Sequence, residues 1–186
     1  MERQRAILLA LILAIAVGGC AQPARHNCPP EELILYAGAF PSGTSLGNLV
    51  SPLPDEPGSS AGRTFYLKEG IANHDVVRYA NSYWAAQEFE HTKRATIFTA
   101  SSGAGDAAIS VDYVSPLADQ YRVACGREHS LLVCQMIGQY ENYFVRFSVH
   151  MTPGVVGVPE LTGMLREIDA RMAGCMEKPL EVRAGL

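Results

Sequence analysis

Cysteine is the residue type in this 186-residue chain with the clearest chemical potential. The chain has five cysteines, and four of them lie beyond the first 20 residues: Cys28, Cys125, Cys134 and Cys175. No two of the four are spaced as C-x-x-C, the arrangement that zinc sites use, and the five histidines show no metal spacing either. We therefore predict neither a metal nor a cofactor. In an oxidising compartment four cysteines form two disulfides, for which three connectivities exist.

Spacing favours one of these connectivities. Cys125 and Cys134 lie on two expected strands joined by the polar turn GREHS, whereas Cys28 opens the body of the protein and Cys175 follows its last expected helix. We therefore expect the pairs Cys125–Cys134 and Cys28–Cys175. The second pair closes a loop of about 147 residues, which stabilises the fold by roughly 5 kcal/mol if the effect is entropic.

One pentapeptide imitates a catalytic motif. GTSLG, centred on Ser45, matches the G-x-S-x-G of a hydrolase nucleophile elbow. An elbow requires a strand before the serine and a helix after it. The residues that follow, NLVSPLPDEP, are too rich in proline to begin a helix. We expect a loop here and keep a serine hydrolase centred on Ser45 as an alternative function.

The first 19 residues have the order of a secretory signal. Arg3 and Arg5 precede an uncharged run over 6–19, and this run ends in two glycines. The run has fourteen residues, and a membrane-spanning helix needs about 20. We therefore expect residues 1–19 to be a signal peptide that is removed.

The residues VGGC at 17–20 follow this run where a bacterial lipobox would stand. The N-terminus thus resembles that of bacterial lipoproteins. The resemblance implies that Cys20 becomes the mature N-terminus, carries diacylglycerol and a fatty acid such as palmitate, and anchors the protein to the extracytoplasmic side of the cell membrane. Ala21 rather than Asp follows Cys20, so no inner-membrane retention signal is present and an outer-membrane location stays open.

Composition describes a folded body behind this anchor. Hydrophobic residues make up 48% of the chain and charged residues 18%, a globular balance. Without residues 1–19 the chain keeps 13 basic and 18 acidic residues, a net charge of −5, which argues against nucleic acid or anionic lipid as the main partner. We expect a tether over 20–30, one domain over 31–178 and a flexible tail over 179–186.

The first half of the body carries several expected elements. We predict strands over 33–37, 63–69, 74–80, 95–100 and 107–114, and a long surface loop rich in proline and glycine over 38–62. A helix over 82–94 follows Asn81, its expected N-cap. Near its start lies an aromatic cluster, interpreted as core with a stacking platform for sugar or peptide as the alternative: Tyr79, Tyr83, Trp84 and Phe89.

Three antiparallel strands are expected between 119 and 151. If Cys125 faces Cys134, and Glu141 and Asn142 form a two-residue turn, one sheet face is almost wholly apolar. The opposite face then carries a candidate binding surface for a small molecule, formed by Gln135, Gln139, Arg146, Ser148 and His150. The planar guanidinium of Arg146 suits a carboxylate or a phosphate.

A final helix is predicted after Pro159, because apolar residues recur there at helical spacing: Leu161, Met164, Leu165, Ile168 and Met172. This stripe should lie on the apolar sheet face. The expected fold class is therefore α+β, a twisted antiparallel β-sheet with one mid-sequence helix and one C-terminal helix packed on it.

Three stretches carry a second resemblance: VVRYANSYWAAQEFE at 76–90, ADQYRVACGREHSLLVCQMIGQYENYFVRFSV at 118–149 and ELTGMLREIDARM at 160–172. Their layout is similar to that of uncharacterised bacterial lipoproteins and of extracytoplasmic sensor domains. The resemblance implies a non-enzymatic module that binds a small molecule or an envelope protein. A structural component of the envelope is a further alternative.

Overall fold

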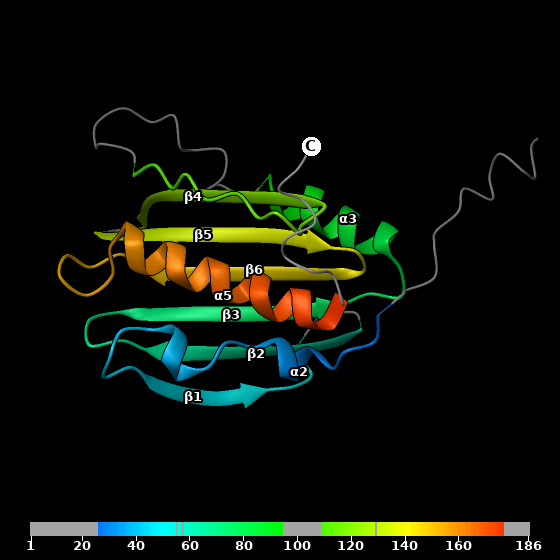
Figure 1. Ribbon diagram of the computed structural model, residues 1–186, viewed down its shortest axis with the longest axis horizontal. Coiled ribbons are helices and arrows are strands. Elements are labelled where there is room, and N and C mark those ends of the chain that lie inside the picture. The colour runs from blue at the N-terminus through cyan, green and yellow to red at the C-terminus, as the bar shows by residue number, and fades with distance from the viewer. Residues whose placement is uncertain (1–25, 55, 57, 95–108, 129, 177–186) are drawn as a thin grey trace, which may run out of the picture.

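A six-stranded antiparallel sheet forms the centre of the protein in a computed structural model, which describes residues 26–54, 56, 58–94, 109–128 and 130–176 (Figure 1). The strand order is β1-β2-β3-β6-β5-β4. The strands are β1 (Ser45–Val50), β2 (Ser59–Tyr66), β3 (Ile71–Arg78), β4 (Gln120–Glu128), β5 (Leu131–Tyr140) and β6 (Tyr143–His150). Helices pack on this sheet, which confirms the predicted α+β class.

The hairpin of β5 and β6 has the predicted register. The paired residues include Cys134 and Val149, Met136 and Phe147, Gly138 and Val145, and Tyr140 and Tyr143. The turn consists of Glu141 and Asn142, as predicted, and Glu141 adopts a positive φ of 54°. Because strand side chains alternate between faces, this register decides which residues enter the main core.

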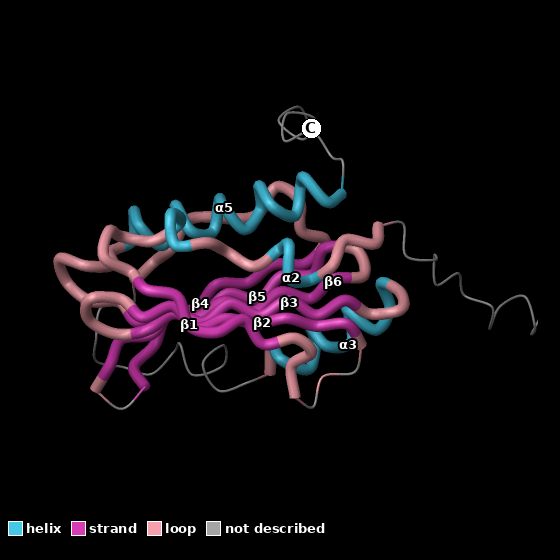
Figure 2. Tube along the Cα trace, turned by 90° about the horizontal axis from the view of Figure 1, so that it is seen from below, coloured by secondary structure: helices cyan, strands magenta, loops and turns pink. Residues whose placement is uncertain are grey.

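Helices lie on both faces of the sheet. The long helix α5 (Val158–Met176) covers one face together with α2 (Pro30–Leu33), and α3 (Ser82–Thr92) lies against the other (Figure 2). Every member of the predicted apolar stripe of α5 is at most 1% exposed: Leu161, Met164, Leu165, Ile168 and Met172. Burial of one such side chain contributes about 1.5–3 kcal/mol, so the layer between α5 and the sheet is the principal core.

The mid-sequence helix α3 begins where predicted. The side chain of Asn81 accepts a hydrogen bond from the Trp84 N–H at 3.2 Å, which confirms it as the N-cap. Ala85 and Phe89 pack in a second, smaller core with residues of β5 and β6. The interpretation of the aromatic cluster as core is wrong for its first turn, because Tyr83 and Trp84 are each 54% exposed.

The predicted strand over 33–37 is wrong. This segment contains the end of α2 and the beginning of the short 3₁₀ helix η1 (Ala37–Ala39). Pro30 occupies the first turn of α2, where its fixed φ suits a helix. Leu33, Ile34 and Leu35 are all buried, whereas consecutive residues of a strand would point to opposite faces.

The predicted loop over 38–62 is also wrong in part, because it contains β1 and the beginning of β2. β1 is an edge strand, and five of its six residues are exposed. An edge strand with so little buried surface has no need of alternating apolar residues. Three of the four prolines that suggested a loop, Pro52, Pro54 and Pro57, follow β1, and Pro41 precedes it.

The predicted strand over 107–114 is not present in its described part, since residues 109–115 belong to no strand. This segment contacts α5 instead, where Tyr113 bonds to a helix residue. Residues 95–108, which include the other strand predicted in this region, lie outside the described residues.

Both predicted disulfides are present. Cys125 and Cys134 face each other on neighbouring strands β4 and β5, with a Cα–Cα distance of 4.0 Å. Cys28 and Cys175 join the start of the described body to the last turn of α5 across 147 residues. The second disulfide therefore links the two ends of the domain over its principal core.

A buried carboxylate connects three parts of the fold. Asp169 of α5 is 1% exposed and accepts hydrogen bonds from the hydroxyls of Tyr113, of Ser115 at 2.7 Å and of Tyr140 at 2.7 Å. Burial raises the pKa of both tyrosines above the usual range, and the Asp169 carboxylate raises it further, so both stay protonated as donors. The network joins α5, β5 and the segment before β4.

Replacing Asp169 with Ala should lower the free energy of unfolding by about 3 kcal/mol or more, because the hydroxyls of buried Ser115 and Tyr140 and of half-buried Tyr113 would lose their acceptor together. Asp112→Ala removes the same group from an exposed position and should change it by less than about 0.5 kcal/mol. Urea unfolding of both variants measures the difference. Equal effects would show that the Asp169 network does not stabilise the fold.

Candidate functional site

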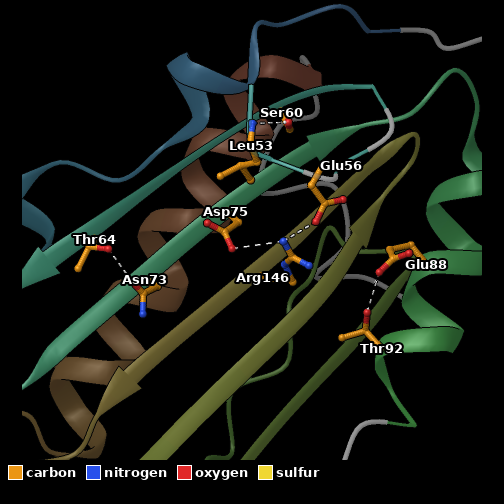
Figure 3. Close-up of polar contacts among 9 residues, drawn as sticks. All are labelled: Leu53, Glu56, Ser60, Thr64, Asn73, Asp75, Glu88, Thr92 and Arg146. Carbon is orange, nitrogen blue, oxygen red and sulfur yellow. Dashed lines mark hydrogen bonds and ion pairs between the residues drawn. The ribbon is translucent and has the colours of Figure 1, made fainter. Parts of the chain in front are cut away.

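Arg146 of β6 is the centre of a charged group on the sheet face that α3 partly covers (Figure 3). Its Nη2 atom lies 2.6 Å from Glu56 Oε1 and 3.4 Å from Asp75 Oδ2. Asp75 lies directly opposite Arg146 on β3, and Glu56 comes from the segment between β1 and β2. The side chains of Arg146, Asp75 and Glu56 are 34%, 28% and 14% exposed, so a molecule in solution can reach this group.

The three charges do not balance. One guanidinium faces two carboxylates, which gives the group a formal charge of −1. Burial raises the pKa of Asp75 above its usual range; the Arg146 cation opposes this shift and the Glu56 charge adds to it. The negative charge of Asp75 is therefore only partly compensated, and an additional positive group would be favoured beside it.

A row of uncharged polar side chains lies next to the charged group. Strand pairing places Asn73 of β3 beside Ser148 of β6, and Ser148 beside Gln135 of β5. The Thr64 hydroxyl donates a hydrogen bond to Asn73 Oδ1 at 2.8 Å and orients that amide (Figure 3). This row adds hydrogen-bond donors and acceptors about 7 Å along the strands from the charges.

Asp75 and Arg146 of the charged group and the three residues of the uncharged row line an open cavity of about 150 Å³. The last turn of α3 contributes Thr92, whose hydroxyl donates to Glu88 Oε1 at 3.0 Å. The polar lining consists of Asn73, Asp75, Thr92, Gln135, Arg146 and Ser148. The cavity is smaller than the roughly 300–1,000 Å³ of drug-sized sites, so it suits a small molecule or one side chain of a partner.

The structure brings three of the five predicted ligand residues together: Gln135, Arg146 and Ser148 all line the cavity. Gln139 does not join them, because it is 4% exposed and its Nε2 donates to the carbonyl oxygens of Ser82 at 3.3 Å and Glu141 at 3.1 Å. It therefore fastens the start of α3 to the β5–β6 turn.

His150 is the other predicted residue that lies apart. It is four residues from Arg146 along β6, a separation of roughly 13 Å. It contacts the turn between β2 and β3 so closely that a Cβ atom at Gly70, whose φ is +100°, would lie 2.7 Å from the His150 Cβ. A ligand confined to the cavity would not span this distance.

The structure adds two acids to the expected ligand chemistry. The sequence predicts that Arg146 binds a carboxylate or a phosphate, and in the structure its guanidinium is paired with Glu56 and Asp75. Neither acid, nor Asn73 or Thr92, was among the predicted site residues. The available signal was the alternation in β3, which directs Asn73 and Asp75 to one face.

Ser45 does not lie in a nucleophile elbow. It is the first residue of β1, is exposed, and is followed by strand rather than helix. Within the described ranges, no group of three or more His, Cys, Asp or Glu side chains is arranged to hold a metal ion.

His74 is a buried core residue on the sheet face that α5 covers. It is fully buried, its Nδ1 accepts a hydrogen bond from the Leu35 N–H at 3.1 Å, and its ring meets that of Phe147 edge-on at 6.0 Å. Burial lowers its pKa to about 3, and the positive charge of Arg171 contributes to the shift. His74 is therefore neutral at physiological pH and belongs to the core.

Comparison with known proteins assigns no family to this site: the chain matches no protein-family model and no curated protein. The predicted lipidation residue, Cys20, lies outside the described residues. In the described part of the chain, no helix is both long and apolar enough to cross a membrane.

His74 should make the protein less stable in mild acid. In the unfolded chain it takes up a proton near pH 6.5, but in the folded protein only near pH 3, so the unfolded state binds more protons between these values. Stability should thus fall as the pH drops from 6.5 towards 3. His74→Asn, whose side-chain oxygen can accept the Leu35 N–H, should remove about 2 kcal/mol of the difference in unfolding free energy between about pH 7 and pH 5.

Urea unfolding at the two pH values measures this difference, and any loss of packing cancels because it affects both. His91→Asn, at an exposed position, is the control and should leave the pH dependence unchanged. An unaltered pH dependence in His74→Asn would contradict the prediction.

Proposed function

We propose that this chain is a lipid-anchored extracytoplasmic protein whose α+β body binds a small polar ligand and catalyses no reaction. The N-terminal order of Arg3, Arg5, an apolar run and the residues VGGC supports the anchor. The two disulfides support an oxidising compartment outside the cytoplasm. The outer membrane is the proposed location where the host has one.

The observation that supports binding is the position of the charged group at the rim of an open polar cavity. Strand pairing holds Arg146 and Asp75, the ion pair with Arg146 holds Glu56, and all three keep part of their surface exposed. Side chains held in this way lose little conformational entropy when a ligand arrives. Ser148 and Gln135, on the neighbouring row, supply uncharged partners.

The charge of the site favours a ligand that carries a positive group, such as an amine or a guanidinium. Placed about 4 Å from Asp75, such a group would gain roughly 1–4 kcal/mol of Coulomb energy at the dielectric of a protein surface. An anion would have to compete with Glu56 and Asp75 for Arg146. The positive group belongs either to a small molecule or to a side chain of an envelope protein.

Replacing Cys20 with Ser should abolish lipid attachment and release the protein from the membrane fraction, because the lipid is attached through the sulfur. Labelling of cells with a radioactive or alkyne-tagged fatty acid, followed by fractionation, measures both effects. Gln22→Ser changes a nearby residue but keeps the Cys20 sulfur and both disulfides, so it should leave the label in place. A label that persists in Cys20→Ser would exclude this residue as the anchor.

Arginine methyl ester should bind the wild-type protein in calorimetric titration, and Asp75→Asn should weaken its binding about tenfold, the effect of about 1.4 kcal/mol. Asp112→Asn makes the same change at an exposed position and should bind as the wild type does. Inorganic phosphate, titrated in parallel, should not bind. Binding of phosphate alone would restore the anion interpretation of Arg146, and binding of neither probe would favour a structural role in the envelope.

A further inference from the structure

Two aromatic side chains are exposed side by side on the first turn of α3. Tyr83 and Trp84 are each 54% exposed, and their rings meet edge-on with centroids 5.2 Å apart. Trp84 is the single tryptophan of the chain. Phe89, on the same helix, is 3% exposed and packs in a core. Tyr83 and Trp84 thus expose their apolar rings to solvent, whereas Phe89 of the same helix is buried.

This pair lies at the end of the sheet where the chain enters the described body. His26, the first described residue, has its Nε2 atom 3.4 Å from Glu141 Oε2 in the β5–β6 turn. The Gln139 amide then links the carbonyl of Glu141 to that of Ser82, which directly precedes Tyr83. Figure 1 shows the same neighbourhood: the blue N-terminal segment and the beginning of α3 lie at one end of the molecule.

The lipid proposed at Cys20 can be only a short distance from this end. His26 comes six positions after Cys20, and a fully extended chain advances at most about 3.3–3.6 Å per residue. The span is therefore roughly 20 Å or less. The polar layer of a bilayer occupies about 5–8 Å on each side of the hydrocarbon, so this end of the body is held close to the headgroups.

The charge of the exposed surface of α3 is also compatible with a membrane surface. The exposed residues of this helix and of the two positions after it are Tyr83, Trp84, Gln87, His91 and Arg94. None is acidic, although the mature chain has a net charge of −5. Glu88 and Glu90 are half-buried, and Glu90 is paired with Lys93. The exposed positions of this surface therefore present no negative charge to lipid phosphates.

We propose that Tyr83 and Trp84 insert into the headgroup region of the bilayer that holds the lipid anchor, as a second membrane contact. Tyrosine and tryptophan favour this region because their rings are apolar while the hydroxyl and indole N–H remain hydrated. The proposal rests on the lipid anchor proposed above. With two points of attachment instead of one, the body has a defined orientation, with the first turn of α3 towards the membrane.

The single tryptophan gives a direct test. The full chain, purified from membranes, is reconstituted into phosphatidylcholine vesicles with and without phosphatidylcholine brominated near the headgroup, because bromine quenches tryptophan only at close range. Brominated lipid should lower the Trp84 fluorescence about twofold, in keeping with an interfacial position. Flotation of the vesicles in a density gradient reports independently whether the protein is anchored.

A matched control moves the probe to the other end of the sheet. Tyr66 ends β2, next to the turn into β3, and is 51% exposed. In the double variant Trp84→Phe, Tyr66→Trp the protein should still float with the vesicles, but brominated lipid should leave its fluorescence unchanged. Equal quenching of the two proteins would overturn the proposal, because it would show that the body has no preferred orientation.

Two further outcomes separate this proposal from the anchor. A protein that floats with the vesicles while Trp84 is not quenched would overturn the aromatic contact alone, and the anchor would stand. A protein that does not float would overturn both. If a soluble oligosaccharide shifts the Trp84 emission without vesicles while brominated lipid has no effect, the pair is a sugar platform and the proposal is wrong.

Discussion

The position of β6 between β3 and β5 is the constraint on which both faces of the sheet depend. Its pairings send Val145, Phe147 and Val149 towards α5, and Arg146 and Ser148 towards the face of α3. A shift of one residue would exchange the two sets, placing a guanidinium in the principal core and apolar side chains around the cavity. The core and the candidate site therefore share one origin.

Elements that depend on local patterns could be predicted from the sequence. The β5–β6 hairpin is specified by a two-residue turn and by alternation, and the stripe of α5 by helical spacing. β1 could not be predicted, because an exposed edge strand buries too little to impose a pattern. Asp169 was missed for a different reason: it follows Leu165 by four residues, on the buried side of the helix, but its donors come from segments distant in sequence.

The residues of the candidate site also divide into those that local patterns predict and those that they do not. Gln135, Arg146 and Ser148 come from one hairpin, so local register was sufficient to place them together. Asp75 precedes Arg146 by 71 residues and Glu56 precedes it by 90, and nothing in a single sequence specifies such long-range pairings. Gln139 shows the opposite error. A polar residue on the predicted face proved to be a hydrogen-bond partner for two backbone carbonyls, which strand alternation cannot reveal.

Asp169 and Asp75 lie on opposite faces of the sheet and differ in exposure. This difference explains why Asp169 is structural and Asp75 is the candidate binding group. Asp169 is 1% exposed and receives three hydroxyl hydrogen bonds, so a ligand could reach it only by breaking the network that holds α5. The Asp75 side chain is 28% exposed and shares one guanidinium with a second carboxylate. Its charge is therefore both accessible and incompletely neutralised. Binding a cation there would complete an interaction that the folded chain leaves unfinished, at no cost to the core.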